Sequence, residues 1–244
     1  MWVRSVSPEL CVLGIDDTDM PGVGGTGQLA RRLAGEFERL GLGIAAGVTR
    51  HQLFEGPGVP KTSRNSAAAI GFERVTSLEK LFKSACKVVS REAAAGSDPG
   101  VAIGRFSQER EVTEFAIRAQ NDLVKQDEAR QLAKAHGVRL VGLGGTEDGV
   151  IGALAAMALR GDGSDGRFVG LPGIREVTGA VSVEQVLERT AISDVIDADS
   201  GRSLEAGSLV DLGDWMRPRL LGGRPVLVAR RSGERWVNAD SRSK

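Results

Sequence analysis

The chain has little of several residue types that mark common classes of protein. Its 244 residues include two cysteines, Cys11 and Cys86, which are too few for a disulfide framework or a structural zinc site. Tyrosine is absent, and His51 and His136 are the only histidines. No apolar run approaches the roughly 18 residues that a membrane-spanning helix needs, and the N-terminal residues lack the pattern of a signal peptide. We therefore predict a cytoplasmic protein with no membrane partner.

The chain also has no formal net charge, because its 32 basic and 32 acidic residues cancel. The overall charge therefore gives no indication of nucleic-acid binding. Residues 217–244 differ from this average, since they hold eight basic and two acidic side chains, a local charge of +6. This basic end is either a solvated surface or a surface that contacts RNA phosphates.

Short apolar runs alternate with amphipathic segments along most of the chain, which predicts an α/β (α+β) fold. The apolar run at residues 10–15 predicts a buried first strand, and apolar residues recur at helical spacing over residues 27–40. The glycine- and proline-rich segments 51–62 and 160–173 predict loops. Further strands are expected at residues 44–49, 66–72, 101–103 and 138–143, and further helices at residues 77–95, 111–121, 126–136, 149–159 and 181–187.

The predicted organisation has three parts. Residues 1–75 hold the acidic turn and the glycine loop described below, and residues 76–180 supply most of the helices. The pattern changes after about residue 180, where short apolar runs within residues 209–237 predict small strands and turns. Residues 181–244 are therefore expected to form a small C-terminal extension that contains β-strands.

Three carboxylates follow the first predicted strand directly, at Asp16, Asp17 and Asp19. Side chains at strand ends are held by a rigid scaffold and remain accessible, as a ligand site requires. Mg²⁺ prefers oxygen ligands and commonly bridges one or two carboxylates to substrate phosphates, so we predict that these aspartates bind metal. If the strand continued through the turn, Asp17 and Asp19 would share one face and Asp16 would point to the other. An acidic surface turn without metal is the alternative interpretation.

A glycine-rich loop then leads into the predicted helix at residues 27–40. Backbone amides at Gly24, Gly25 and Thr26, together with the positive end of the helix dipole, suit a nucleotide phosphate. The loop lacks the Lys-Ser or Lys-Thr of a P-loop. The alternative is a flexible turn in which Thr26 is the helix N-cap.

A basic loop precedes the strand predicted at residues 66–72. Lys61 and Arg64 could stabilise the charge of a transferring phosphoryl group. Thr62 and Asn65 add hydrogen-bonding groups for a bound nucleotide. A solvated loop without catalytic function is the alternative. His51 begins the long loop before these residues and is a further, weaker candidate for catalysis.

Gly149 and Gly152 begin an alanine-rich helix. Glycine in a helix interior is about 1 kcal/mol less favourable than alanine, and close packing or the approach of a ligand could compensate for this difference. The segment is therefore a second candidate loop for nucleotide binding.

Three of these motifs together resemble one family, the archaeal tRNA(Ile) 2-agmatinylcytidine synthetases. Gly-Ile-Asp-Asp-Thr-Asp at residues 14–19 is similar to the opening motif of that family. Pro-Lys-Thr at residues 60–62, with Asn65 and Ala67, is similar to its second motif. Gly-Val-Ile-Gly-Ala-Leu-Ala-Ala at residues 149–156 is similar to its third. The three motifs occur in the order of the family, over roughly residues 10–160.

The resemblance implies a kinase-like domain beside a ferredoxin-like domain, with ATP and Mg²⁺ as cofactors. The family phosphorylates the C2 carbonyl oxygen of a cytidine, and the amine of agmatine then displaces the phosphate. By this resemblance Asp16, Asp17 and Asp19 would bind metal and phosphate, and Thr26 would match an autophosphorylated threonine. The chain has no cysteines for the zinc ribbon of the family and is too short to hold that module and the OB-fold. The likeness therefore concerns the catalytic region alone.

Three functions remain open from the sequence. The leading hypothesis is an enzyme that uses ATP and Mg²⁺ to phosphorylate an oxygen of a small-molecule acceptor. A second hypothesis takes RNA as the substrate. A third is a nucleotide-binding regulatory module without turnover, which is favoured by an acidic pair, Glu147 and Asp148, where the family has Gly-Arg.

Overall fold

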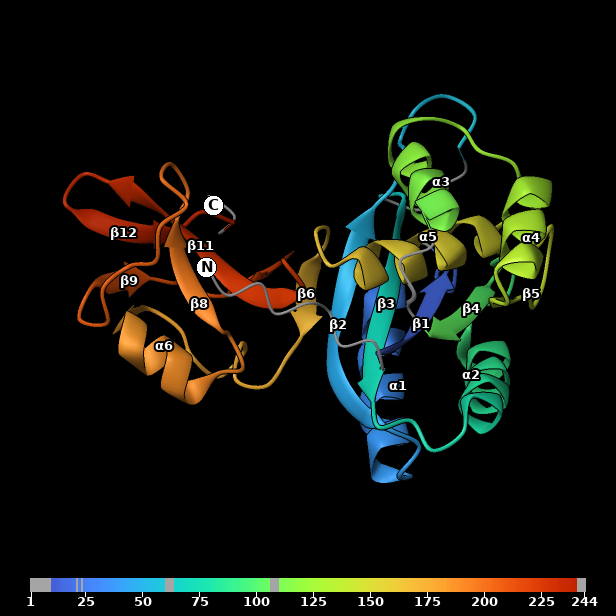
Figure 1. Ribbon diagram of the computed structural model, residues 1–244, viewed down its shortest axis with the longest axis horizontal. Helices are drawn as coiled ribbons and strands as arrows, with labels where there is room; N and C mark the ends of the chain where they lie inside the picture. The colour runs from blue at the N-terminus through green and yellow to red at the C-terminus, as the bar shows by residue number, and fades with distance from the viewer. Residues whose placement is uncertain (1–9, 21, 23, 60–63, 106–109, 241–244) are drawn as a thin grey trace.

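The computed structural model describes residues 10–20, 22, 24–59, 64–105 and 110–240. Within these residues the chain forms six helices and twelve strands, arranged as two lobes (Figure 1). The fold is therefore mixed α/β, as the alternating pattern predicts. No helix among these residues is long and apolar enough to cross a membrane.

The first lobe is built on an antiparallel sheet with the strand order β5-β4-β1-β3-β2-β6. Its strands are β1 (Cys11–Asp16), β2 (Ile44–Gln52), β3 (Ser66–Glu73), β4 (Gly100–Arg105), β5 (Arg139–Gly142) and β6 (Arg167–Gly170). Its helices are α1 (Thr26–Arg39), α2 (Leu78–Glu92), α3 (Arg110–Asn121), α4 (Gln126–Ala135) and α5 (Gly149–Asp162). Strand β1 lies between β3 and β4, so the acidic turn that follows it emerges from the middle of the sheet.

Alternate residues of β1 face opposite sides of this sheet. Cys11, Leu13 and Ile15 pack against the leucine, isoleucine and phenylalanine side chains that α1, α2 and the sheet supply. Val12 packs on the other side, where alanines from α3, α4 and α5 predominate. The sheet is therefore covered on both faces, and the two layers differ in the size of their side chains.

Helix α5 crosses the sheet (Figure 1) and contacts β1, β3 and β4. A Cβ atom placed on Gly14 of β1 would lie 2.0 Å from the carbonyl oxygen of Ala153, and one placed on Gly100 of β4 would lie 2.1 Å from that of Gly149. Only glycine permits this approach at both strands. The contact brings the N-terminal turn of α5 against the end of β1.

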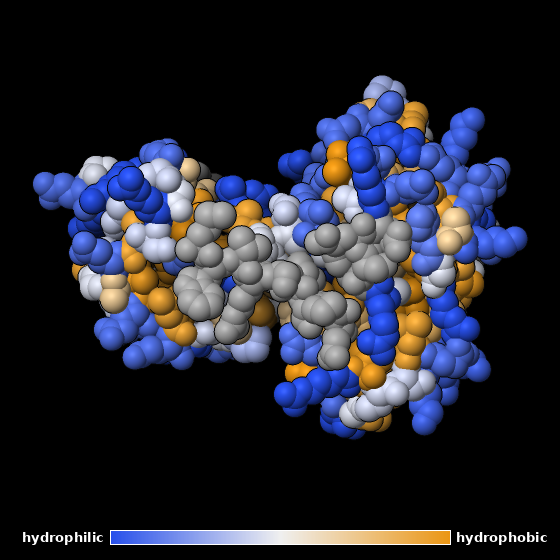
Figure 2. Space-filling model, in the orientation of Figure 1, coloured by the Kyte–Doolittle hydropathy of each residue, from blue (hydrophilic) through white to orange (hydrophobic). Residues whose placement is uncertain are grey.

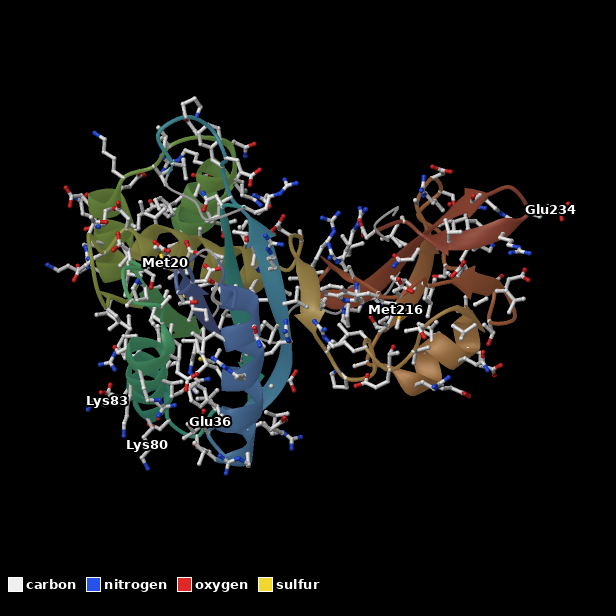
Figure 3. All side chains as sticks on the ribbon, turned by 180° about the vertical axis from the view of Figure 1, so that it is seen from behind. Met20, Glu36, Lys80, Lys83, Met216 and Glu234 are labelled. Carbon is white, nitrogen blue, oxygen red and sulfur yellow. The ribbon has the colours of Figure 1, made fainter. Side chains whose placement is uncertain are left out.

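The second lobe has its own apolar cluster, which runs from Leu171 to Trp236, whereas the clusters of the first lobe extend to Val169. Its elements are β7 (Ala180–Ser182), α6 (Val183–Arg189), β8 (Asp194–Asp197), β9 (Leu209–Asp211), β10 (Arg219–Leu221), β11 (Arg224–Ser232) and β12 (Arg235–Asn238). Met216, labelled in Figure 3, is fully buried in this cluster. Strand β6 joins the lobes, because it pairs with β2 on one side and with β10 on the other. The three-part division expected at residues 75/76 and 180/181 stays a prediction.

Some local predictions are wrong. The segment 160–173 is not one loop, since α5 continues to Asp162 and β6 follows. The loop expected from His51 begins later, because β2 extends to Gln52. The helix expected over 181–187 begins at Val183, where the hydroxyl of Ser182 accepts the backbone N–H of Gln185 in a capping box.

Figure 2 shows one face of both lobes, on which hydrophilic residues predominate and apolar residues form scattered patches on each lobe. In Figure 3, Lys80 and Lys83 project from α2 away from the body of the first lobe. These lysines therefore belong to the solvated surface of that lobe.

Candidate functional site

The acidic turn lines one pocket with all three of its carboxylates. Strand β1 ends at Asp16, and Asp17 has a positive φ of 48°, a conformation that aspartate adopts more readily than most residues. The chain therefore turns at this point, and Asp16, Asp17 and Asp19 all border a pocket of about 450 Å³. The division of the carboxylates between two faces, expected for a continuing strand, is wrong because the strand stops. Figure 3 marks this turn through Met20, the residue that follows it.

Asp16 lies against the first turn of α5. A Cβ atom on Gly152 would be 1.8 Å from Oδ2 of Asp16, so this glycine makes room for the carboxylate. The pKa of Asp16 is raised to about 7, mainly by burial; a backbone hydrogen bond at Asp17 lowers it, and the neighbouring charges of Asp17 and Asp19 contribute to the rise. The positive end of the α5 dipole faces this position and favours the ionised carboxylate. Because the pKa of Asp16 is about 7, the carboxyl group is partly protonated at neutral pH, and a bound cation would favour its ionised form.

Burial is also the largest cause of the raised pKa of Asp17. The charges of Asp98, Asp19 and Asp148 raise this pKa too, whereas a backbone hydrogen bond at Asp98 lowers it. Asp98 comes from the segment before β4, and Asp148 is the N-cap of α5. Four carboxylates from three segments therefore influence one another across this pocket.

Thr26 is bound to the acidic turn through its hydroxyl group. The Thr18 hydroxyl donates to the Thr26 Oγ1 at 3.1 Å, and the Thr26 hydroxyl donates to the Asp19 Oδ1 at 3.3 Å. Thr18 and Thr26 are both buried. Thr26 is the first residue of α1, whose N-cap is Gly25. The side chain of Thr26 therefore holds the turn against the helix, and it is not the N-cap.

Gly24 and Gly25 lie beside the pocket and are not among the described residues that line it. A Cβ atom on Gly25 would be 3.4 Å from the Asp19 Oδ2. The start of α1 is therefore adjacent to the carboxylate of Asp19. A role for Gly24, Gly25 and Thr26 in nucleotide binding stays a prediction.

The basic loop contributes Arg64 and Asn65 to the pocket lining. Asn65 Nδ2 donates to the carbonyl oxygen of Phe54 at 2.7 Å, and its backbone N–H donates to the Glu55 carboxylate at 3.2 Å. The exposed Arg64 pairs with the same carboxylate at 3.3 Å. The other two predicted residues of this loop, at positions 61 and 62, lie outside the described residues.

The predicted residues of α5, Gly149 and Gly152, also line the pocket. Sequence reasoning missed four further charged residues of the lining, Asp98, Asp122, Lys125 and Asp148. The position of Asp148, directly before the third motif, is the one signal that could have identified any of them. Six aspartates and two basic side chains, Arg64 and Lys125, therefore face this pocket within the described part of the chain.

The donor set of the pocket suits a hard cation, since it offers carboxylate and carbonyl oxygens. Among the described residues, however, no three His, Cys, Asp or Glu side chains converge closely enough to hold a metal ion by themselves. Mg²⁺ commonly completes its coordination with water and substrate phosphates. A metal at Asp16, Asp17 or Asp19 would therefore need a second ligand source, such as a nucleotide.

His51 does not take part in this pocket. Its ring is fully buried in β2, where Nε2 lies 2.8 Å from the Thr49 Oγ1 and Nδ1 lies 2.8 Å from the Asp165 Oδ2. Burial lowers the pKa of His51 and outweighs the opposing effect of Asp165. The neutral ring with hydrogen on Nδ1 satisfies both contacts, because it donates to Asp165 and accepts from Thr49. His51 therefore joins β2 to the turn after α5.

Comparison with known proteins gives no matching family model. Crystal structures of TiaS are similar to this chain. The TiaS complex with an isoleucine tRNA and ATP has a TM-score of 0.55 and 27% identity, over 62% of this chain and 36% of that chain. The complex with tRNA, AMPCPP and agmatine has a TM-score of 0.54 and 26% identity, over 61% of this chain and 36% of that chain. The chain shares a TiaS-like fold. Apo TiaS, described as a tRNA agmatidine synthetase, matches with a TM-score of 0.52 and 26% identity.

A curated protein is also similar, an uncharacterized protein of Methanocaldococcus jannaschii. It is 30% identical over 154 residues, which are 62% of this chain and 50% of that protein. The chain therefore spans half the length of this relative and 36% of the TiaS chain in the ATP complex. These similarities support the resemblance to the synthetase at the level of the fold.

Proposed function

We propose that the acidic pocket binds ATP with Mg²⁺ and transfers its phosphoryl group to an oxygen of an acceptor. The observation that carries the proposal is the convergence of Asp16, Asp17 and Asp19 on one pocket at the N-terminus of α5. A helix N-terminus attracts phosphate, and the carboxylates attract a cation. The solved TiaS complexes with ATP and AMPCPP support the nucleotide.

The residues divide between two tasks in this proposal. Asp17 and Asp19, and Asp16 when it is ionised, would hold Mg²⁺, which neutralises phosphate charge during transfer. Gly149 and Gly152 let the first turn of α5 approach β4 and the Asp16 carboxylate closely, which brings the N-terminus of α5 to the pocket, where it would meet a phosphate group. Arg64, together with Lys61, would stabilise charge on the moving phosphoryl group. Asn65 fixes the loop that carries Arg64 through its bond to Phe54.

The acceptor in the leading form of the proposal is a small molecule. A pocket of about 450 Å³ is within the range of small-molecule sites. Six aspartates against two basic residues would also favour a cationic second substrate, such as an amine that displaces the transferred phosphate. The TiaS complex with agmatine supports an amine of this type.

RNA is the second candidate acceptor. Arg230, Arg231 and Arg235 are exposed on β11 and β12 and could contact phosphates. The similarity to TiaS bound to a tRNA gives no reason to set RNA aside. Electrophoretic mobility shift against tRNA at several salt concentrations tests this candidate. Replacing the three arginines by glutamine should weaken binding and flatten its salt dependence, and unchanged binding would contradict it.

Thermal unfolding with and without ATP, in the presence and absence of Mg²⁺, tests the nucleotide site. Ligand at a hundred times its dissociation constant adds about 2.7 kcal/mol, which corresponds to a rise of about 5–10 °C for a chain of this size. We expect a rise that needs both ATP and Mg²⁺. Asp17→Asn should abolish it together with ATP turnover, since the variant removes a metal ligand while keeping the side-chain shape.

Asp127→Asn provides the matched control, because Asp127 is exposed on α4 and outside the pocket. It should leave both the rise and the turnover unchanged. If the chain is instead a regulatory module, the rise persists and no acceptor gives ADP or AMP. The absence of any rise at millimolar ATP would refute the nucleotide site itself.

A further inference from the structure

A second pocket lies on the opposite face of the first-lobe sheet, where α1 packs. It has a volume of about 290 Å³ and is formed by α1, β2 and the segment after β6. It shares no residue with the acidic pocket. Its apolar walls include Val48, Leu171 and Pro172. Two arginines from different segments, Arg31 and Arg175, also line it.

The two guanidinium groups are anchored close together. The stem of Arg31 lies against Gly170, where a Cβ atom would be 2.8 Å from its Cγ, and its Nη1 donates to the Gly27 carbonyl oxygen at 3.2 Å. Arg175 Nη2 donates to the carbonyl oxygen of Val169 at 3.2 Å. Burial lowers the pKa of Arg31, and the charge of Arg175 lowers it further. Each guanidinium has five N–H donors, so most of them remain available to a ligand.

No carboxylate forms a direct ion pair with either arginine in the described part of the chain. Glu38 and Glu176 also line the pocket, but neither pairs with Arg31 or Arg175. The Glu176 carboxylate accepts the backbone N–H of Arg175 at 3.3 Å. Two neighbouring like charges repel each other, and an anion between them would convert that repulsion into attraction.

Trp215 fixes the orientation of Arg175. The Cζ of Arg175 lies 4.8 Å from the centre of the Trp215 ring, which is a favourable cation–π distance. The Cζ of Arg217 lies 4.4 Å from the same ring. Trp215 is 37% exposed, so its ring remains partly open beside the arginines. The Arg175 guanidinium is therefore held in place before any ligand arrives, which reduces the entropy lost on binding.

We propose that Arg31 and Arg175 form a phosphate-binding site. Paired guanidinium groups recognise phosphate oxygens through bidentate, charge-assisted hydrogen bonds. The phosphate could belong to a small phosphorylated molecule or to the backbone of RNA, and the test below separates the two. The site shares no lining residue with the acidic pocket, so its test does not depend on the proposed phosphoryl transfer.

NMR of the arginine Nε–H groups tests the site in the full-length chain, since the signals of Arg31 and Arg175 disappear individually in Arg31→Gln and Arg175→Gln. We expect titration with inorganic phosphate to shift both signals along one saturating curve. Each substitution should weaken phosphate binding by about tenfold or more, as loss of one charge-assisted pair implies. Arg39→Gln is the matched control, because Arg39 is exposed on the same helix and lies outside the pocket. It should leave the affinity unchanged.

Glu38→Gln gives the opposite expectation. It removes a negative charge from the lining and should strengthen phosphate binding by about two- to fivefold. In a parallel titration with a 5′-phosphorylated single-stranded RNA, saturation by RNA alone would identify the nucleic-acid backbone as the source. Saturation by inorganic phosphate would identify a small phosphorylated ligand. Shifts that do not saturate with either probe, or equal weakening by Arg39→Gln, would overturn the site.

Discussion

The two faces of the first-lobe sheet are packed by different means. On the α1 and α2 face, large side chains such as Phe37, Phe72 and Leu33 fill the space between helix and strand. On the α5 face, alanines and glycines allow helix and sheet backbones to come into direct contact. Large side chains give stability that tolerates small shifts, whereas backbone contact fixes a helix end in one position. The acidic pocket forms where the second kind of packing prevails.

Gly14→Ala should disturb the backbone contact between β1 and α5, and it is expected to cause the largest loss of stability. The added Cβ would lie 2.0 Å from a backbone oxygen of α5, which cannot move aside as a side chain can. We expect a loss of about 3 kcal/mol or more in the free energy of unfolding, measured by urea denaturation. Gly35→Ala is the control, because apart from its chain neighbours and the backbone of α1 no atom of the described structure lies within 4 Å of its added Cβ, and alanine should stabilise α1 by up to about 1 kcal/mol. Equal stability of the two variants would contradict the close contact.

His51→Gln tests the buried contacts of His51 with Thr49 and Asp165 on the α5 face, through the dependence of stability on pH. Because the folded protein holds His51 with a pKa below its ordinary 6.5, the unfolded chain binds the proton more readily. The stability of the native protein should therefore fall as the pH drops below 6.5. The glutamine variant should be less stable by about 1–3 kcal/mol at pH 8 and should lose less on acidification. A parallel pH dependence in both proteins would show that His51 is not the group concerned.

Phe37→Leu tests the packing of large side chains on the α1 and α2 face of the sheet. Phe37 is fully buried, and its ring centre lies 6.3 Å from that of Phe72. Leucine keeps most of the apolar volume, so we expect a loss of about 1–2 kcal/mol in the free energy of unfolding. The rise in melting temperature with ATP and Mg²⁺ should persist, because the large-residue face does not shape the acidic pocket. Loss of that rise would mean that both faces position the site.

The sequence predicts the turn and the helix that form the acidic pocket, but it does not predict several of the charged residues that line it. The turn at Asp16 and the helix that begins at Gly149 follow from local patterns, an apolar run before carboxylates and glycines before alanines. Asp98 precedes β4, which pairs with β1 and β5, whereas Asp122 and Lys125 lie between α3 and α4, which pack against α5. Such long-range contacts leave no periodic signal.

Two strand errors have a similar origin. His51 and Gln52 are polar and lie beyond the apolar run that predicts the strand at residues 44–49, yet pairing with β3 extends β2 through them. Strand β6 lies in a glycine-rich segment and is held by β2 and β10 on its two sides. In both places the neighbouring strands override the preference of the local sequence.

A backbone amide of strand β6, that of Phe168, can report on the connection between the two lobes. Phe168 donates its backbone N–H to Pro218 in the second lobe at 2.7 Å, while the strand also pairs with β2 in the first. The exchange of that amide with deuterium therefore requires the connection between the lobes to open. Its protection measures, at one atom, how often the two lobes separate and how a ligand bound to either lobe changes that frequency.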